Sequence, residues 1–368
     1  MNWKKAIALI LVQLMLIVGA GSMLSAQPAS VDSMSEEDWQ KLEAAVQRAV
    51  AYLLSQQHED GQIVDNKRNR VSMTALAIMG MSSVGHKPSD DTKEGQAMKR
   101  ALDYVLQAKH QDKDGYYGID GSRMYGHGII TMMLAEMIGM AADEEQDKKV
   151  RASLQKAIDL IVKSQNAPKK DPKHEGGWRY KPNDDTSDLS VSAWQLIALR
   201  AAKNAGIKVP GGAIDKAVDY LKRSYSSPGS KKGEVREKSF FTYQPGQRNF
   251  RFGSAAAGLL VLQICGEYEA PEVIGAADYF LDYELKGPDS GEYFYYGLYY
   301  YAQGMYQMGG KYAEKAKEAV RDVLFDTQLE DGSWQPGKKE RGAGHVFTTS
   351  MGLLSLSIHY HFLPIYQR

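Results

Sequence analysis

Three aspartates stand close together in the middle of this chain: Asp184, Asp185 and Asp188. Carboxylates held near one another raise each other's pKa, which suits acid catalysis, so these three are our candidate catalytic residues. The same oxygens could instead bind a hard cation such as calcium. A structural role is the third interpretation, with Asp188 or Ser190 accepting hydrogen bonds from the first N–H groups of a helix. The sequence leaves these three interpretations open.

A second set of candidates lies where apolar stretches of the chain begin. Histidine, arginine and several aromatic residues gather at these positions, and such a mixture is typical of a ligand pocket. Their rings could stabilise a cation or stack on a sugar or a lipid, although any one of them could also cap or pack a helix. The candidate ligand-binding residues are Tyr125, His127, Trp178, Arg251, Tyr295, Tyr299 and His345.

A repeated unit positions these residues. Each copy has a first helix that starts on a basic or small residue, in several copies a Gln, a turn that usually pairs Gly with an aromatic residue, and then a second helix. The 270 residues from Ala49 to Ala319 cover five steps, which gives 54 residues per repeat and six copies. A period of this length is enough for two helices and their turns.

The two helices of a unit differ in character. The first carries charges on one side, as expected of a helix that faces solvent. The second is nearly free of charge and must be buried on all sides. We expect these second helices at 70–84, 124–141, 188–204, 251–266, 295–309 and 345–362. Six buried helices inside six exposed ones predict an all-α (α/α)6 toroid spanning 40–362 as a single domain, with an open superhelical solenoid as the alternative.

Composition excludes several classes of protein. The 368 residues include 45 basic and 45 acidic side chains, so no general attraction to nucleic acid is expected. One cysteine can form neither an internal disulfide nor a Cys-rich zinc site. We expect no cofactor and no metal. Tyrosine outnumbers phenylalanine by 22 to 9, and a buried tyrosine requires a hydrogen-bond partner.

The first 26 residues are typical of a signal peptide. Lys4 and Lys5 precede an apolar run from Ala6 to Ala20, and small residues follow up to an expected cut after Ala26. A run this short predicts cleavage rather than a stable membrane span, with an uncleaved anchor as the alternative. We therefore expect a periplasmic or extracellular protein.

The repeats resemble the QW motif of the squalene-hopene cyclase and oxidosqualene cyclase superfamily. Lys156 to Trp178 and Lys317 to Trp334 are the closest copies, and the resemblance spans about 40 to 362. The chain is similar to secreted bacterial members of the prenyltransferase and squalene oxidase repeat group. This resemblance implies an α/α toroid.

Activity carries over less directly from this resemblance. Cyclases have two barrels and an Asp-x-Asp-Asp-Thr motif whose middle Asp protonates the polyene. Here Asp184, Asp185 and Thr186 match, but Pro182 replaces the first Asp, and the chain has one barrel.

Two toroidal relatives are tested by their motifs around Cys265. Protein prenyltransferases need Asp-x-Cys, whereas Gln263 and Ile264 precede this cysteine. Thioester domains need Cys-Gly-Glu-Gln, whereas Tyr268 takes the last position.

We therefore expect an exported binding or scaffolding protein with an aromatic central pocket for a hydrophobic or sugar ligand, and a protein partner is possible. The alternative is a cyclase- or lyase-like enzyme that uses an aspartic acid on an isoprenoid or a polysaccharide.

Overall fold

The computed structural model describes residues 34–226, 238–290, 292–360 and 362–366. The chain divides into two units, Met1–Ser33 and Met34–Arg368. The expected signal peptide falls outside the described residues. Within the described ranges, no helix is long and apolar enough to cross a membrane.

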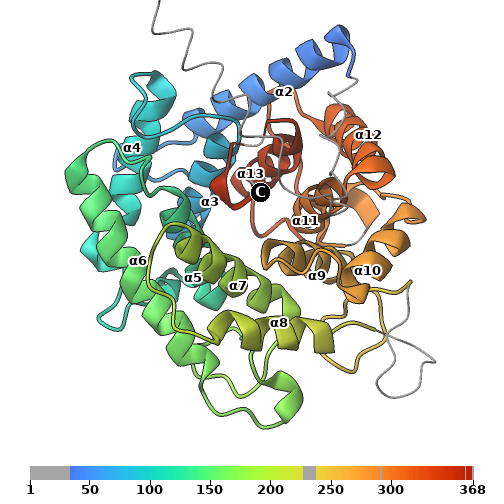
Figure 1. The fold of residues 1–368 in the computed structure, drawn as a ribbon. Coiled ribbons are helices and arrows are strands. Elements are labelled where there is room, and N and C mark those ends of the chain that lie inside the picture. Colours follow the sequence, from blue (N-terminus) through green and yellow to red (C-terminus); the bar gives the residue numbers. More distant parts are fainter. Residues whose placement is uncertain (1–33, 227–237, 291, 361, 367–368) are drawn as a thin grey trace, which may run out of the picture. The chain divides into compact units, whose positions relative to one another are not determined.

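Helices alternate between two layers of a double ring (Figure 1). The inner helices are α3 (Arg70–Ser83), α5 (Arg123–Glu136), α7 (Leu189–Asn204), α9 (Phe252–Ile264), α11 (Phe294–Met308) and α13 (His345–Leu356). The outer helices are α2 (Glu36–Ser55), α4 (Lys93–Val105), α6 (Glu144–Gln165), α8 (Ala213–Arg223), α10 (Pro271–Leu281) and α12 (Gly310–Thr327). Within the described residues, the chain has no extended strand, only isolated bridges in its turns.

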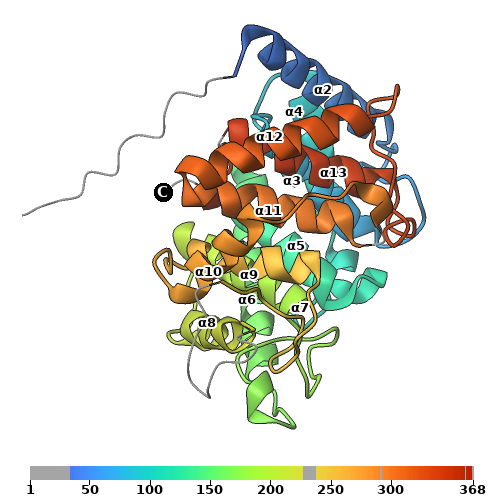
Figure 2. The ribbon, with the colours of Figure 1, turned by 90° about the vertical axis from the view of Figure 1, so that its right-hand side faces the viewer.

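The inner ring is closed. Each inner helix contacts the next one along the chain, and α13 returns to contact α3. In Figure 2, the outer helix α12 runs beside the inner helices α11 and α13, and it contacts both. The predicted all-α toroid is therefore confirmed, and the open solenoid is wrong. The physical reason is burial: every residue of α9 is buried, so the charge-free helices need neighbours on every side.

Most inner helices begin and end within about two residues of the predicted positions, with two exceptions. We expected the second of them to reach residue 141, but α5 ends at Glu136 and the chain turns at Gly139 with a positive φ of 77°. The last was expected to reach residue 362, but α13 ends at Leu356. There the amide of Gln303 donates to the Leu354 carbonyl at 2.8 Å and to the Ser357 hydroxyl at 2.9 Å, and a 3-10 turn follows.

In four of the six repeats, a glutamine connects neighbouring units. Its side-chain amide donates one hydrogen bond to a glycine carbonyl in its own turn and a second to a carbonyl of the next outer helix. The donors are Gln57, Gln111, Gln165 and Gln328, and their second acceptors are Ala97, Ser153, Ala213 and Ala45. The bond from Gln328 to Ala45 is 2.8 Å long and joins the last repeat to the first.

The glycine of this turn is required by geometry. Gly332 has a φ of +88°, and a Cβ atom there would overlap the carbonyl of Arg48 in α2. The turn of one repeat thus packs directly on the backbone of the next, which fixes the distance between units.

Candidate functional site

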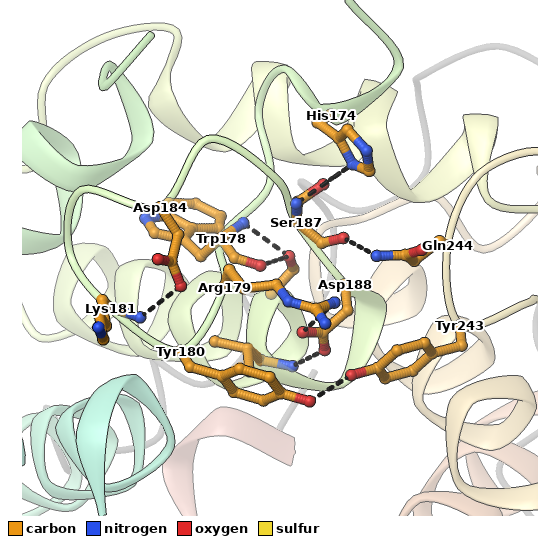
Figure 3. Close-up of polar contacts among 12 residues, drawn as sticks. His174, Trp178, Arg179, Tyr180, Lys181, Asp184, Ser187, Asp188, Tyr243 and Gln244 are labelled. Atoms are coloured by element: carbon orange, nitrogen blue, oxygen red, sulfur yellow. Dashed lines mark hydrogen bonds and ion pairs between the residues drawn. The ribbon is translucent and has the colours of Figure 1, made fainter. Parts of the chain in front are cut away.

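Asp188 is the N-cap of α7. Its side chain is fully buried, and Oδ1 accepts a hydrogen bond of 2.9 Å from the Val191 N–H (Figure 3). Its own N–H donates to the Trp178 carbonyl at 2.9 Å. The structural interpretation of this aspartate as a helix cap therefore describes one of its two carboxylate oxygens.

The loop before α7 holds Asp188 in a fixed position. The indole N–H of Trp178 donates to the Ile161 carbonyl of α6 at 2.8 Å, and the backbone N–H of Trp178 donates to the Ser192 hydroxyl of α7 at 2.9 Å. His174 and Ser187 are hydrogen-bonded through their side chains at 2.9 Å. These contacts bind the loop to both helices of its repeat, so the position of the carboxylate is set before any ligand arrives.

The second oxygen of Asp188 faces a cation. The Arg179 guanidinium lies 3.3 Å from Oδ2, and it also lies over the rings of Tyr180 and Tyr243, at 4.6 and 5.7 Å from their centroids. The two phenol hydroxyls are hydrogen-bonded to each other at 2.6 Å. Arg251, the exposed N-cap of α9, lies 4.7 Å from the Tyr243 centroid. Figure 3 shows the guanidinium of Arg179 next to the Asp188 carboxylate, with the paired hydroxyls of Tyr180 and Tyr243 on the other side of that carboxylate in this view.

Burial raises the pKa of Asp188 to about 6. The Val191 N–H and the Arg179 guanidinium both favour the carboxylate and oppose this rise, but desolvation is the larger effect. A group with this pKa is mostly ionised at neutral pH and becomes protonated in mildly acidic solution.

Two further tyrosines complete the surroundings of Asp188. The ring of Tyr125, from α5, lies 6.1 Å from that of Tyr180, and the Tyr296 hydroxyl of α11 donates to the Ser190 carbonyl at 3.3 Å. Both side chains keep partial access to water, yet burial raises the pKa of each phenol well above its ordinary value. Access combined with desolvation indicates that they line a recess rather than an outer surface.

We call this group the Asp188 cluster. It consists of Tyr125, Arg179, Tyr180, Asp188, Tyr243, Arg251 and Tyr296. Its residues stand at or near the first turns of α5, α7, α9 and α11, four consecutive helices of the inner ring. Of the candidates from the sequence, the structure brings together Tyr125, Asp188 and Arg251.

The other two aspartates lie elsewhere. Asp184 accepts a hydrogen bond of 2.9 Å from the Lys181 N–H and closes a turn, and its carboxylate points away from Asp188 in Figure 3. Asp185 is exposed, and its carbonyl accepts from the Lys170 N–H. The expected mutual effect of the three carboxylates is thus not the cause of the raised pKa of Asp188, which comes from burial.

His127 and Trp178 belong to the wall between the two helix layers. The Nδ1 atom of His127 accepts from the Tyr117 N–H at 3.3 Å, and Nε2 lies 3.2 Å from the Ala157 carbonyl of α6. The bond from the Tyr117 N–H to His127 corresponds to the bond in the next repeat from the Trp178 backbone N–H to the Ser192 hydroxyl, since each joins a turn to the inner helix that follows it. Burial lowers the pKa of His127 to about 4. Its ring therefore stays neutral and joins the turn to the outer helix, with no nitrogen left for a ligand.

Tyr295, Tyr299 and His345 are also placed away from the Asp188 cluster. Tyr295 is fully buried against Phe294. The ring of Tyr299 is stacked on Trp194 of α7, with centroids 5.9 Å apart. His345 bonds the Ser333 hydroxyl at 3.1 Å and lies beside Tyr52 of α2.

The centre of the inner ring is packed with aromatic side chains. Trp194 of α7 meets Tyr299 and Tyr300 of α11, although these two helices are not neighbours in the ring. All three side chains are at most 1% exposed. Of Tyr295, Tyr296 and Tyr299, only Tyr296 is partly accessible, at the start of α11.

Sequence reasoning missed Arg179 and Tyr243 as site residues. Arg179 follows the Trp of the third repeat directly, and Tyr243 ends the aromatic run of the fourth repeat. A usable signal was their place in the turns that precede α7 and α9, because these turns are adjacent at the rim of the ring. Within the described residues, no group of three or more His, Cys, Asp or Glu side chains is placed to hold a metal ion.

No protein-family model matches this chain. Drimenyl diphosphate synthase from Streptomyces showdoensis is 28% identical over 177 residues, which are 48% of this chain and 30% of that protein. The match therefore spans less than a third of the length of this curated relative.

Solved structures share the fold at low sequence identity. The type II terpene cyclase MstE from Scytonema, in complex with geranylgeranyl dihydroxybenzoate, has a TM-score of 0.58 and 15% identity, over 90% of this chain and 100% of that one. An inactive variant of the α-1,6-mannanase GH76A of Salegentibacter sp. HEL1_6, in complex with α-1,6-mannotetrose, has a TM-score of 0.59 and 11% identity, over 86% and 98%. The chain thus has a terpenoid-cyclase-like α/α-toroid fold.

Proposed function

We propose that this chain is an exported binding protein that holds a polyhydroxylated, sugar-like ligand at the Asp188 cluster. The observation that carries the proposal is a buried carboxylate paired with Arg179 at 3.3 Å and surrounded by partly accessible tyrosines. A carboxylate, a guanidinium and phenol hydroxyls together offer both acceptors and donors, which suits a ligand with many hydroxyl groups.

The polarity of the cluster argues against a purely hydrocarbon ligand. Such a ligand would exclude water from the ion pair of Asp188 and Arg179 without replacing the lost hydrogen bonds, which is unfavourable. The faces of Tyr180 and Tyr243 already lie against guanidinium groups. They are therefore poorly placed to stabilise a carbocation, as a polyene-cyclising site would require.

Export rests on the signal-peptide pattern of residues 1–26. A periplasmic or extracellular location is consistent with a sugar ligand, and the fold is shared with a protein solved with α-1,6-mannotetrose. A protein partner would extend this role to scaffolding.

Calorimetric titration with two defined probes tests this proposal. We expect α-1,6-mannotetraose or a related oligosaccharide to bind the wild type, and Asp188→Asn to weaken that binding at least tenfold. Asparagine still caps α7, so the variant removes the charge and retains the helix start. Asp184→Asn is the matched control, because its carboxylate lies in the same loop but faces Lys181. Failure of every oligosaccharide tested, or equal affinity in the two variants, would contradict a sugar site here.

Acid catalysis by Asp188 is the second candidate function. It is supported by the raised pKa of this buried carboxyl and by the partial match to drimenyl diphosphate synthase. Incubation with geranylgeranyl dihydroxybenzoate below pH 6, followed by mass spectrometry with chromatography, would reveal cyclised products. Product formed by the wild type and absent with Asp188→Asn would favour the enzyme over the binding protein.

A further inference from the structure

The end of the ring opposite the Asp188 cluster is filled by the chain's own last described segment. Residues 363–366 form a short turn that includes the 3-10 helix η6 (Pro364–Tyr366). Leu363, Ile365 and Tyr366 are each at least nine-tenths buried, although no inner or outer helix of the toroid contains them. We call residues 363–366 the tail segment.

The tail segment contacts helices on opposite sides of the inner ring. The Tyr366 hydroxyl is hydrogen-bonded to the Tyr299 hydroxyl of α11, and the Ile365 N–H donates to Glu136 Oε2 of α5 at 3.2 Å. η6 also packs on α7. In the order of the ring, α5 and α11 are three helices apart, which is the greatest separation that six helices allow. A segment that touches both must lie across the lumen.

The position of Glu136 fixes which end of the lumen this is. Glu136 is the last residue of α5, whereas Tyr125 of the Asp188 cluster lies in the first turn of the same helix. The Asp188 cluster and the tail segment therefore lie toward opposite ends of the inner ring.

The tail segment packs against a buried carboxyl group. Glu136 is 3% exposed, and its one hydrogen bond from outside α5 among the described residues comes from the tail backbone. Burial raises the pKa of this carboxyl to about 8, so it is mostly protonated at neutral pH. Apolar side chains with one N–H donor and one phenol hydroxyl thus fill a chamber bordered by an uncharged carboxyl group and Tyr299.

We propose that the tail segment is a displaceable internal plug, and that the chamber it fills is a second binding site for an amphiphile with an apolar body and a single hydrogen-bond donor. In the bound state the donor of the amphiphile takes the place of the Ile365 N–H at Glu136, and its apolar body takes the place of Ile365 and Tyr366. The tail segment is suited to leave because it is one short turn, and both of its hydrogen bonds cited here end on ring side chains, the Tyr299 hydroxyl and the Glu136 carboxyl, rather than on the ring backbone. This inference does not depend on the ligand of the Asp188 cluster.

The test uses N-phenyl-1-naphthylamine, a neutral fluorescent probe with an apolar body and one N–H donor. We expect a variant that ends at Phe362 to bind this probe at least tenfold more tightly than the full chain. A synthetic peptide with the sequence of residues 362–368 should compete with the probe. The same peptide with Tyr366→Ala is the matched control and should compete poorly, because it lacks the phenol that reaches Tyr299.

A second variant tests the plug without shortening the chain. Tyr366→Phe removes the hydroxyl pair with Tyr299 and retains the ring, so its probe affinity should fall between those of the full chain and the shortened variant. The proposal is overturned if the shortened variant unfolds cooperatively at the wild-type temperature and binds the probe no better. It is also overturned if shortening abolishes cooperative unfolding, since the tail segment would then belong to the core, or if the peptide fails to compete.

Discussion

Replacing Asp188 by asparagine should change how the stability of this protein depends on pH. The carboxyl is fully buried, and its folded-state pKa of about 6 compares with an ordinary value of 3.8. Because the folded pKa is raised, the protonated carboxyl stabilises the folded state below pH 3.8, and this contribution is lost as the pH rises through 6. The full difference corresponds to about 3 kcal/mol.

The measurement is the free energy of unfolding in guanidinium chloride, followed by tryptophan fluorescence at several pH values. Between pH 4 and pH 7 the wild type should lose about 2 kcal/mol relative to Asp188→Asn, because only the wild type exchanges a proton at this position. Asparagine accepts the Val191 N–H as aspartate does, so the helix start is retained in both proteins. Effects of the other carboxylates are common to both proteins and cancel in the difference.

Two results would refute this reasoning. A difference in unfolding free energy that stays constant with pH would show that burial does not raise the pKa of Asp188. A difference that changes in the opposite direction, with the wild type gaining stability as the pH rises, would show that the ion pair with Arg179 outweighs desolvation. Asp184→Asn serves as the control for the loss of a carboxylate from the same loop.

Three further predictions concern the toroid itself. His127→Ala should lower the free energy of unfolding by about 3 kcal/mol, since it leaves a buried N–H and a buried carbonyl unpaired. Sugar affinity at the Asp188 cluster should not change. A loss of sugar affinity as large as the loss of stability would place this histidine in the site. Gly332→Ala should lower the free energy of unfolding by more than about 2 kcal/mol, because its Cβ would overlap the backbone of α2. Gly206 has a similar φ of 76° and open space around it, so Gly206→Ala should cost about 1 kcal/mol. Equal melting temperatures of the two variants would contradict the close approach at Gly332. Gln328→Ala should lower the free energy of unfolding by about 2 kcal/mol and increase hydrogen exchange in α2, because the amide of Gln328 joins the last repeat to the first. Exchange that increases only in α12 would argue that this bond does not close the ring.

Much of the fold could be predicted because each repeat contains a helix pair whose burial can be inferred from the distribution of its charges. A charge-free helix such as α9 has no face that can remain in water, so it must be surrounded. The glutamine and glycine of the turn were visible as a pattern, and the structure gives their physical meaning. Gln328 bonds to the first outer helix, and Gly332 lets the two backbones approach.

The candidate site was predicted only in part. The sequence directed attention to the start of α7, and Asp188 lies there with Tyr125 and Arg251 in the same cluster. It could not separate Asp184 from Asp188, which are four positions apart. The fold of the loop directs the Asp184 carboxylate to the backbone N–H of Lys181 and the Asp188 carboxylate to the Arg179 guanidinium. The same applies to His127, whose neighbours come from a different helix.

The sequence by itself determined that the charge-free helices must be surrounded by other helices, and it favoured a double ring over an open solenoid. The tertiary structure decided that the ring closes, since α13 contacts α3 and Gln328 bonds to Ala45. Only the tertiary structure decided which side chains reach the rim. Tyr295 and Tyr296 are adjacent in the sequence, yet the first is fully buried and the second is partly accessible beside Ser190. Successive residues of a helix point about 100° apart, and the rotation of each helix about its axis is set by packing against its neighbours, which no single repeat encodes.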